Sequence, residues 1–288
     1  IETHMTRTRS NPVIGLVGSQ GHYGRWLREF FQTRMQLTVL GTDQGQPGTS
    51  TPDQLLQRCQ VLVFCTPIRH TPAIIADYVA LAGGREREAL WLDITSVKQP
   101  PVDAMLRSQA EVVGLHPMTA APKAPTLKGR VLVVCEARLV HWRGWFESFL
   151  KALRAQCVHT TPEKHDQIMA LVQALVHAGH LAQASVLEEL GARLGGLAAL
   201  LPFRSAAFEL DAAVISRMLA MNPAIYEDIQ FGNPHVLPVL DALVRTVTAL
   251  RNNVAQGDEA ARHRFRSQYF DTVAAAIGAP TVAAGNYT

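Results

Sequence analysis

Two patterns of apolar residues divide the chain. In the first part, short apolar runs alternate with segments that carry apolar residues at helical spacing. Uninterrupted apolar runs are typical of strands buried on both faces, as in a mostly parallel sheet covered by helices. The predicted strands are residues 12–18, 36–40, 60–65, 89–94, 111–115, 130–135 and 156–160, with helices near 26–35, 53–58, 72–81, 102–108 and 140–154.

After residue 160 the apolar residues recur only at helical spacing. Residues 165–190, 205–221 and 235–254 each fit a helix. Several of these helices are apolar over a wider face than one helix layer needs. We therefore expect them to pack together and against a second copy of the chain, as a homodimer.

Composition and charge exclude several classes of protein. The chain has 288 residues, a net charge of +3 and no dense Lys/Arg block, so we expect no nucleic-acid partner. We see no signal peptide and no apolar run long enough to cross a membrane. Cys59, Cys65, Cys135 and Cys157 lack zinc-site spacing. They predict reduced thiols in a cytoplasmic protein without a metal site.

A glycine-rich turn follows the first predicted strand. Gly18, Gly21 and Gly24 have G-x-x-G-x-x-G spacing, close to the G-x-G-x-x-G of dinucleotide-binding turns. Such glycines allow a tight turn, close approach of a pyrophosphate, and packing of helix on strand. The alternative is a glycine turn without a ligand. The predicted cofactor residues in this turn are Gly18, Ser19, Gln20, Gly21, His22, Tyr23 and Gly24.

Asp43 lies near the end of the second predicted strand, where an acidic residue can bind the adenosine ribose. It can equally be a solvated turn aspartate. No arginine follows at once to hold a 2′-phosphate, which favours NAD without excluding NADP. Cys65, Thr66 and Pro67 end the third strand and are expected to line the cofactor.

Two later strands end in polar residues, with Ser96 and Lys98 after one and His116 on the other. In a parallel sheet all three reach the edge where the cofactor binds. A lone histidine there would more often be structural, but three such groups together favour an active site. We predict an α/β, Rossmann-like dinucleotide-binding domain over residues 12–160, then an all-α domain over 161–280. Residues 1–11 are expected to be a tag and disordered N-terminus, and 281–288 a tail.

Four segments in this order resemble the prephenate dehydrogenase family, which includes arogenate and cyclohexadienyl dehydrogenases. They are IGLVGSQGHYGRW, LDITSVK, GLHPM and EKHDQIMALVQALVHA, and the resemblance extends over residues 12–275. It implies a Rossmann-like domain followed by a helical substrate and dimerisation domain. It also implies NAD(P)-dependent oxidative decarboxylation of prephenate, a cyclohexadiene dicarboxylate, to 4-hydroxyphenylpyruvate in tyrosine biosynthesis.

The resemblance implies roles for individual residues. His116 accepts the proton of the C4 hydroxyl as hydride leaves. Ser96 orients His116 or touches the hydroxyl and nicotinamide, and Lys98 acts electrostatically or by positioning. Arg217 holds a substrate carboxylate, unless it is a surface arginine. His165, Gln173 and His177 border the substrate pocket, unless they are core or interface residues.

The chain also departs from the family pattern. FELDA places Phe208 and Glu209 where relatives carry Tyr-Arg-Leu-Glu-Leu, and TAAP replaces Phe-Gly-Pro after HPM. An acid in the pocket would favour an amine-bearing substrate, arogenate or 4-amino-4-deoxyprephenate. We expect no fused mutase or regulatory domain. Two other hypotheses are a Rossmann dehydrogenase of a simple hydroxy acid and a nucleotide-binding sensor dimer without catalysis.

Overall fold

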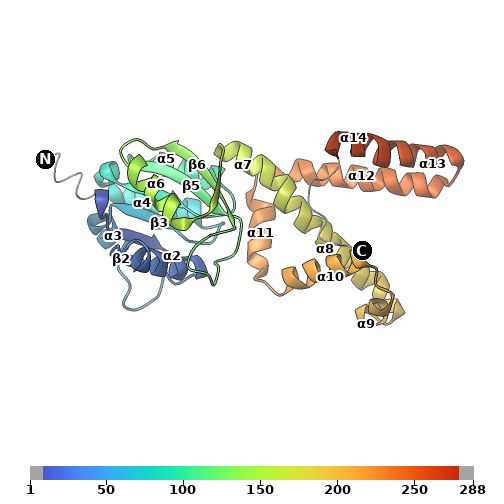
Figure 1. The fold of residues 1–288 in the computed structure, drawn as a ribbon, viewed down its shortest axis with the longest axis horizontal. Coiled ribbons are helices and arrows are strands. Elements are labelled where there is room, and N and C mark those ends of the chain that lie inside the picture. The colour runs from blue at the N-terminus through green and yellow to red at the C-terminus, as the bar shows by residue number, and fades with distance from the viewer. Residues whose placement is uncertain (1–8, 279–288) are drawn as a thin grey trace. The chain divides into compact units, whose positions relative to one another are not determined.

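The computed structural model describes residues 9–278, and these divide into two compact units (Figure 1). The first unit contains residues up to Met169 together with Ala224–Pro234, and the second contains Ala170–Pro223 and the chain from His235 onward. Residues 1–8 of the expected tag and the expected tail, 281–288, lie outside the described residues.

The first unit is built on a seven-stranded sheet with the order β2-β1-β3-β4-β5-β6-β7. All neighbouring strands are parallel except β5 and β6, which are antiparallel. The mostly parallel sheet predicted from the apolar runs is confirmed. The strands are β1 Ile14–Val17, β2 Val39–Thr42, β3 Val61–Phe64, β4 Leu90–Asp93, β5 Glu111–Pro117, β6 Val131–Arg138 and β7 Gln156–His159.

Helices cover both faces of this sheet, in keeping with the wholly apolar sequences of the central strands β1 and β3. Two helices, α2 and α6, supply Phe30, Phe31 and Phe149 to the core on one face. The other face carries α3, α4 and α5, with Ile75 and Met105 in its core. The helices are α2 His22–Thr33, α3 Pro52–Arg58, α4 Thr71–Ala82, α5 Gln99–Leu106 and α6 Arg143–Leu153.

The carboxyl ends of β2, β1, β3 and β4 lie level with one another, and β5 continues past this level to Pro117. Thr42 pairs with Val17, Val17 with Phe64, Phe64 with Asp93, and Asp93 with Gly114. The residues that follow these positions therefore emerge along one edge of the sheet. Ligands of open α/β sheets bind at this edge.

Two helices outside the sheet region also belong to the first unit. They are α7 Pro162–Met169 and α11 Pro223–Gly232, and the contact division places Pro223 itself in the second unit. By length and composition, the continuous helical run Pro162–Leu194 is apolar enough to cross a membrane. This differs from the sequence expectation. The run begins with His165 and Asp166 buried in the α/β unit.

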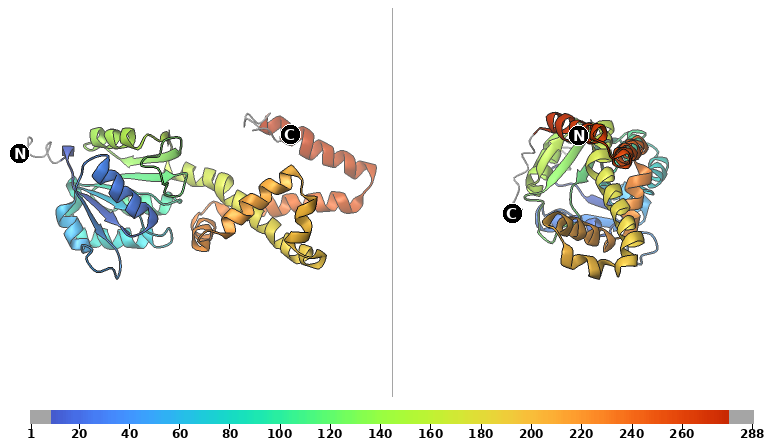
Figure 2. Two further views of the ribbon diagram at one scale, coloured as in Figure 1. Left: turned by 60° about the horizontal axis from the view of Figure 1, so that its bottom comes forward. Right: turned by 90° about the vertical axis from the view of Figure 1, so that its right-hand side faces the viewer.

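The second unit is entirely helical within the described residues, as predicted. Figure 2 shows α12 followed by the α13–α14 segment, which turns back from the C-terminal end of α12. Large apolar side chains remain exposed in this unit, including Phe203 at 89% and Val254 at 70%. Its main elements are η2, a π-helix over Ala170–Leu175, α8 Val176–Gly191, α9 Leu197–Leu200, α10 Ala206–Leu219, α12 Val236–Gln256, α13 Glu259–Phe265, η5, a π-helix over Arg266–Thr272, and α14 Val273–Ile277.

Candidate active site

The glycine turn has the geometry of a site for a phosphate group. Gly18 has a positive φ of 81°, and a Cβ on it would meet the Cys65 carbonyl oxygen at 2.9 Å. A Cβ on Gly24 would lie 2.4 Å from the Gly18 carbonyl oxygen, so only glycine lets α2 start this close to the turn. No side chain caps the N-terminus of α2 at Gly21. The first N–H groups of α2 are therefore open to an anion.

Asp43 directly follows β2 and is tied to the same turn. Its Oδ2 accepts a hydrogen bond from the Gln20 backbone N–H at 2.9 Å. The Thr42 carbonyl accepts from the N–H groups of Gly18 and Ser19 at 3.0 and 3.1 Å. This places a carboxylate beside the dinucleotide turn, where the sequence predicted it.

The remaining predicted cofactor residues lie around this turn. His22 is exposed at the start of α2, and the Tyr23 hydroxyl donates to the Thr119 carbonyl at 2.6 Å. Cys65, Thr66 and Pro67 follow β3, and the Thr66 hydroxyl bonds to that of Thr71 at 2.7 Å. The hydrogen bond of Tyr23 joins helix α2 to the loop after β5.

His116 lies at the end of β5, and only 3% of its surface is exposed. Its Nδ1 lies 2.8 Å from Nε2 of His165 on α7. His165 in turn bonds through Nδ1 to Oδ1 of Asp166 at 2.7 Å. The three side chains form a chain of hydrogen bonds, with the carboxylate at one end and His116 at the other. The sequence analysis proposed His165 for the border of the substrate pocket, and the structure places it in direct contact with His116.

Burial lowers the pKa of His116 well below its ordinary value, and the nearby His165 and Lys98 lower it further. Burial also lowers the pKa of His165, while its hydrogen bond to Asp166 acts in the opposite direction. Both imidazoles are therefore neutral near pH 7. A neutral imidazole has one nitrogen that can accept a proton.

Asp166 was not singled out from the sequence. Its Oδ1 accepts from the Lys98 N–H at 2.8 Å and its Oδ2 from the Gln99 N–H at 2.9 Å. It thus caps α5, which immediately follows the turn that carries Ser96. The one signal for Asp166 in the sequence was its position next to His165 in the HDQ segment. Its capping contacts join residues that lie 67 and 68 positions apart in the chain, so they are not visible in a local pattern.

Lys98 differs from the expectation that it reaches the edge of the sheet. Its side chain is fully buried, and Nζ contacts Asp93 and donates to the Leu115 carbonyl at 2.7 Å. Burial disfavours both charges, lowering the pKa of Lys98 and raising that of Asp93. The lysine lies beneath β5 and beside His116, so its positive charge acts on the imidazole from inside the domain.

Ser96 is half-buried in the turn between β4 and α5. The other predicted substrate residues lie in the second unit. Arg217 is exposed on α10, while Gln173 and His177 are half-buried around η2 and α8. Glu209 is 3.7 Å from Arg204.

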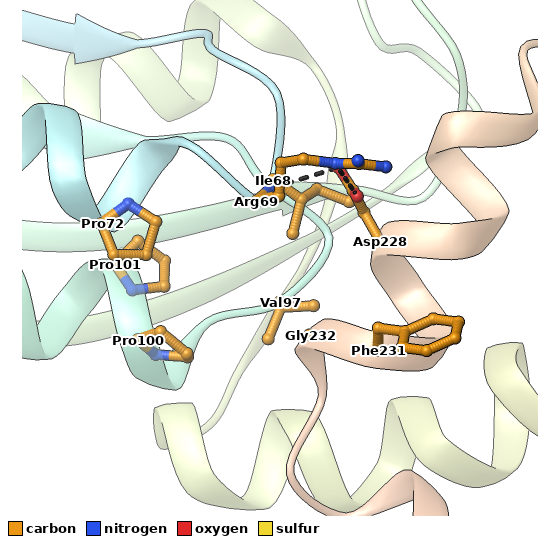
Figure 3. Close-up of a pocket in the computed structure, with 9 residues that line it drawn as sticks. All are labelled: Ile68, Arg69, Pro72, Val97, Pro100, Pro101, Asp228, Phe231 and Gly232. Carbon is orange, nitrogen blue, oxygen red and sulfur yellow. Dashed lines mark hydrogen bonds and ion pairs between the residues drawn. The ribbon is translucent and has the colours of Figure 1, made fainter.

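Helix α11 is bound to the loop after β3 by an ion pair and a hydrogen bond between Arg69 and Asp228. Arg69 donates to Asp228 through Nε at 2.5 Å and through its backbone N–H at 3.2 Å. Beside this ion pair lies a small, largely apolar pocket of about 260 Å³ (Figure 3). It is lined by Ile68, Arg69, Pro72, Val97, Pro100, Pro101, Asp228, Phe231 and Gly232.

Two family profiles match the chain. The prephenate dehydrogenase nucleotide-binding domain matches residues 41–138, and the prephenate dehydrogenase dimerization domain matches residues 161–267. A 4-amino-4-deoxyprephenate dehydrogenase of Streptomyces pristinaespiralis is 30% identical over 227 residues, which is 77% of this chain and 72% of the relative. The chain belongs to the prephenate dehydrogenase family.

Further relatives match over most of this chain. A probable arogenate/prephenate dehydrogenase of Methanocaldococcus jannaschii is 26% identical over 88% of this chain. This chain spans 61% of that relative and 64% of the T-protein of Enterobacter agglomerans. A prephenate dehydrogenase from A. aeolicus, solved with hydroxyphenyl propionate and NAD+, has the same fold. Its TM-score is 0.69 at 16% identity, covering 91% of this chain and 97% of the other.

Proposed function

We propose that the chain is an NAD-dependent dehydrogenase that oxidatively decarboxylates prephenate or a close analogue. The buried, neutral His116, at the sheet edge that carries the dinucleotide turn, supports this proposal most directly. A neutral imidazole in this position is suited to accept one proton from a substrate near pH 7.

The turn suits the pyrophosphate of NAD. The backbone around Gly18 and Gly24 is too close for other side chains, and the N-terminus of α2 has no side-chain cap. Asp43 would hold the adenosine ribose, with its carboxylate oriented by the Gln20 N–H. The A. aeolicus relative of the same fold was solved with NAD+. Bound NAD would supply the hydride acceptor.

His116 would bind the C4 hydroxyl of prephenate through Nε2 and take its proton as hydride leaves C4. The C1 carboxylate then departs as carbon dioxide, and its bonding electrons complete the aromatic ring. The proton on His116 returns to the ring oxygen, because a phenol stays protonated near pH 7. No net proton is released, and the protein has to orient the ring and hold one proton. Ser96, beside this edge, would contact the same hydroxyl.

The dicarboxylate substrate needs cationic partners, and we propose Arg217 for one carboxylate. Gln173 and His177 would border the ring. An amine-bearing substrate is the second candidate, for two reasons. The Streptomyces relative is named for 4-amino-4-deoxyprephenate, and Glu209 stands where the family commonly has a basic residue.

We also propose that the second unit forms a homodimer. Few of its apolar side chains are buried within one chain, whereas Leu194 and Leu219 are 69% and 68% exposed. Such a surface is typical of one covered by a partner. Sedimentation equilibrium should give twice the chain mass, and a monomer at micromolar concentration would contradict this proposal. All four cysteines are free thiols, in keeping with an enzyme of the cytoplasm.

The test is a comparison of kcat/KM for prephenate, arogenate, 4-amino-4-deoxyprephenate and a 3-hydroxy acid, each with NAD and NADP. We expect NADH formation with one of the cyclohexadienes and none with the hydroxy acid. Turnover of the hydroxy acid alone, or cofactor binding without turnover of any cyclohexadiene, would overturn the proposal.

A further inference from the structure

We propose that Asp166 and His165 are positioning residues that hold His116 in a single tautomer, protonated on Nδ1 and with Nε2 as the proton acceptor. The inference rests on the proposed function for its meaning in catalysis. The tautomer itself can be measured without turnover.

The side chain of Asp166 is fully buried. Its two oxygens face the backbone N–H groups of Lys98 and Gln99, which can only donate. These groups form the N-terminus of α5, where a negative charge is favoured. An ionised carboxylate only accepts hydrogen bonds. The ring nitrogen that faces it, Nδ1 of His165, must therefore carry the proton.

His165 is neutral near pH 7, because burial lowers its pKa. With its one proton on Nδ1, its Nε2 has a lone pair and can only accept. The atom 2.8 Å away, Nδ1 of His116, must then be the donor. Nε2 of His116 keeps its lone pair, and it makes no hydrogen bond within the described chain.

The opposite tautomers of the two histidines are unfavourable because of the contact between His165 and Asp166. If His116 carried its proton on Nε2, a neutral His165 would have to donate from Nε2. Its Nδ1 lone pair would then face the Asp166 carboxylate at 2.7 Å. Two buried acceptors would be opposed with no hydrogen between them, which leaves both unsatisfied. In that state His116 would present an N–H to the substrate and could not accept its proton.

Backbone contacts fix the direction of these hydrogen bonds. The carboxylate cannot rotate without losing the cap on α5, and α7 places His165 next to it in sequence. The same carboxylate therefore binds the backbone of the segment after Ser96 and sets the tautomer of His116. The two rings meet edge to face, with centroids 5.0 Å apart.

The first experiment is ¹⁵N NMR of the histidine-labelled full chain above pH 7, with His116 assigned through His116→Asn. We expect the Nδ1–H form in the wild type. In Asp166→Asn the amide can direct its NH2 at His165 and reverse both rings. We expect this variant to shift His116 toward the Nε2–H form and to lose about 10²–10⁴-fold in kcat/KM, with NAD affinity unchanged.

Glu111→Gln is the matched control. Glu111 is also a buried carboxylate, and it accepts from the N–H groups of Val140, His141 and Trp142 at 2.7, 2.7 and 3.0 Å. It stands at the opposite end of β5 and has no bond to His116. We expect this variant to keep the His116 tautomer and its kcat/KM.

A second pair of variants covers the case in which Asp166→Asn does not fold. The amide of His165→Gln can donate to Asp166 and accept from His116, so it should preserve the tautomer and much of the activity. His165→Met can do neither, and it should lose both. A wild-type Nε2–H form, or the same tautomer in Asp166→Asn and His165→Met, would overturn the inference. If the tautomers behave as expected but no cyclohexadiene is turned over, the proposed function fails and the positioning role stands.

Discussion

Nδ1 of His116 lies 2.8 Å from Nε2 of His165, although 49 residues separate them in the chain. The contact joins the end of β5 to α7. It also buries His116 away from water on the side opposite the atom that would meet the substrate.

Burial lowers the pKa of His116, so its neutral form should persist to pH values below the ordinary histidine value of about 6.5. Because the neutral form is the proton acceptor, activity is lost as pH falls through the lowered pKa. We expect kcat/KM for prephenate to remain level from neutral pH down through about 6.5, and to fall only below it. An acid limb at or above about 6.5 would contradict the assigned pKa direction.

Alanine at Gly24 should lower the stability of the protein, whereas alanine at Gly21 should lower its affinity for NAD. A Cβ on Gly24 would lie 2.8 Å from Ser19 backbone atoms, whereas one on Gly21 would have its nearest neighbour at 3.5 Å. We expect Gly24→Ala to lower the free energy of unfolding by about 1–3 kcal/mol in denaturant.

Gly21→Ala serves as the paired variant. Its unfolding free energy should stay within about 0.5 kcal/mol of wild type. Its Kd for NAD, measured by calorimetry, should rise about tenfold because the new methyl group meets the pyrophosphate. Equal NAD affinity in this variant and the wild type would place the cofactor elsewhere.

The buried pair of Lys98 and Asp93 should be needed for stability. Lys98→Met leaves the Asp93 carboxyl without its cation, and breaking a buried pair costs about 3–5 kcal/mol. Denaturant unfolding measures this loss. Lys128→Met, at an exposed lysine, should change stability by less than about 0.5 kcal/mol. The double variant Asp93→Asn/Lys98→Met should lose less than the sum of the single changes. Strict additivity would show that the pair is not coupled.

Local patterns in the sequence were enough to predict the sheet, the glycine turn and the placement of Asp43. Uninterrupted apolar runs identify buried strands, but they carry no information on direction, so the antiparallel pairing of β5 and β6 was not foreseen. Lys98 was assigned to the sheet edge because its partner Asp93, in the same LDITSVK segment, was not considered. The roles of Asp166 and His165 depend on contacts between α7, α5 and β5. Such long-range contacts leave no periodic trace in the sequence.

The most direct test of the central claim compares NADH formation from prephenate, or from the cyclohexadiene that the wild type prefers, in wild type and His116→Asn. NAD affinity is measured in both proteins. We predict a loss of about 10²–10⁴-fold in kcat/KM with unchanged NAD affinity, because asparagine fills the site but cannot accept the proton. Normal turnover by His116→Asn would contradict the role of His116 as the proton acceptor.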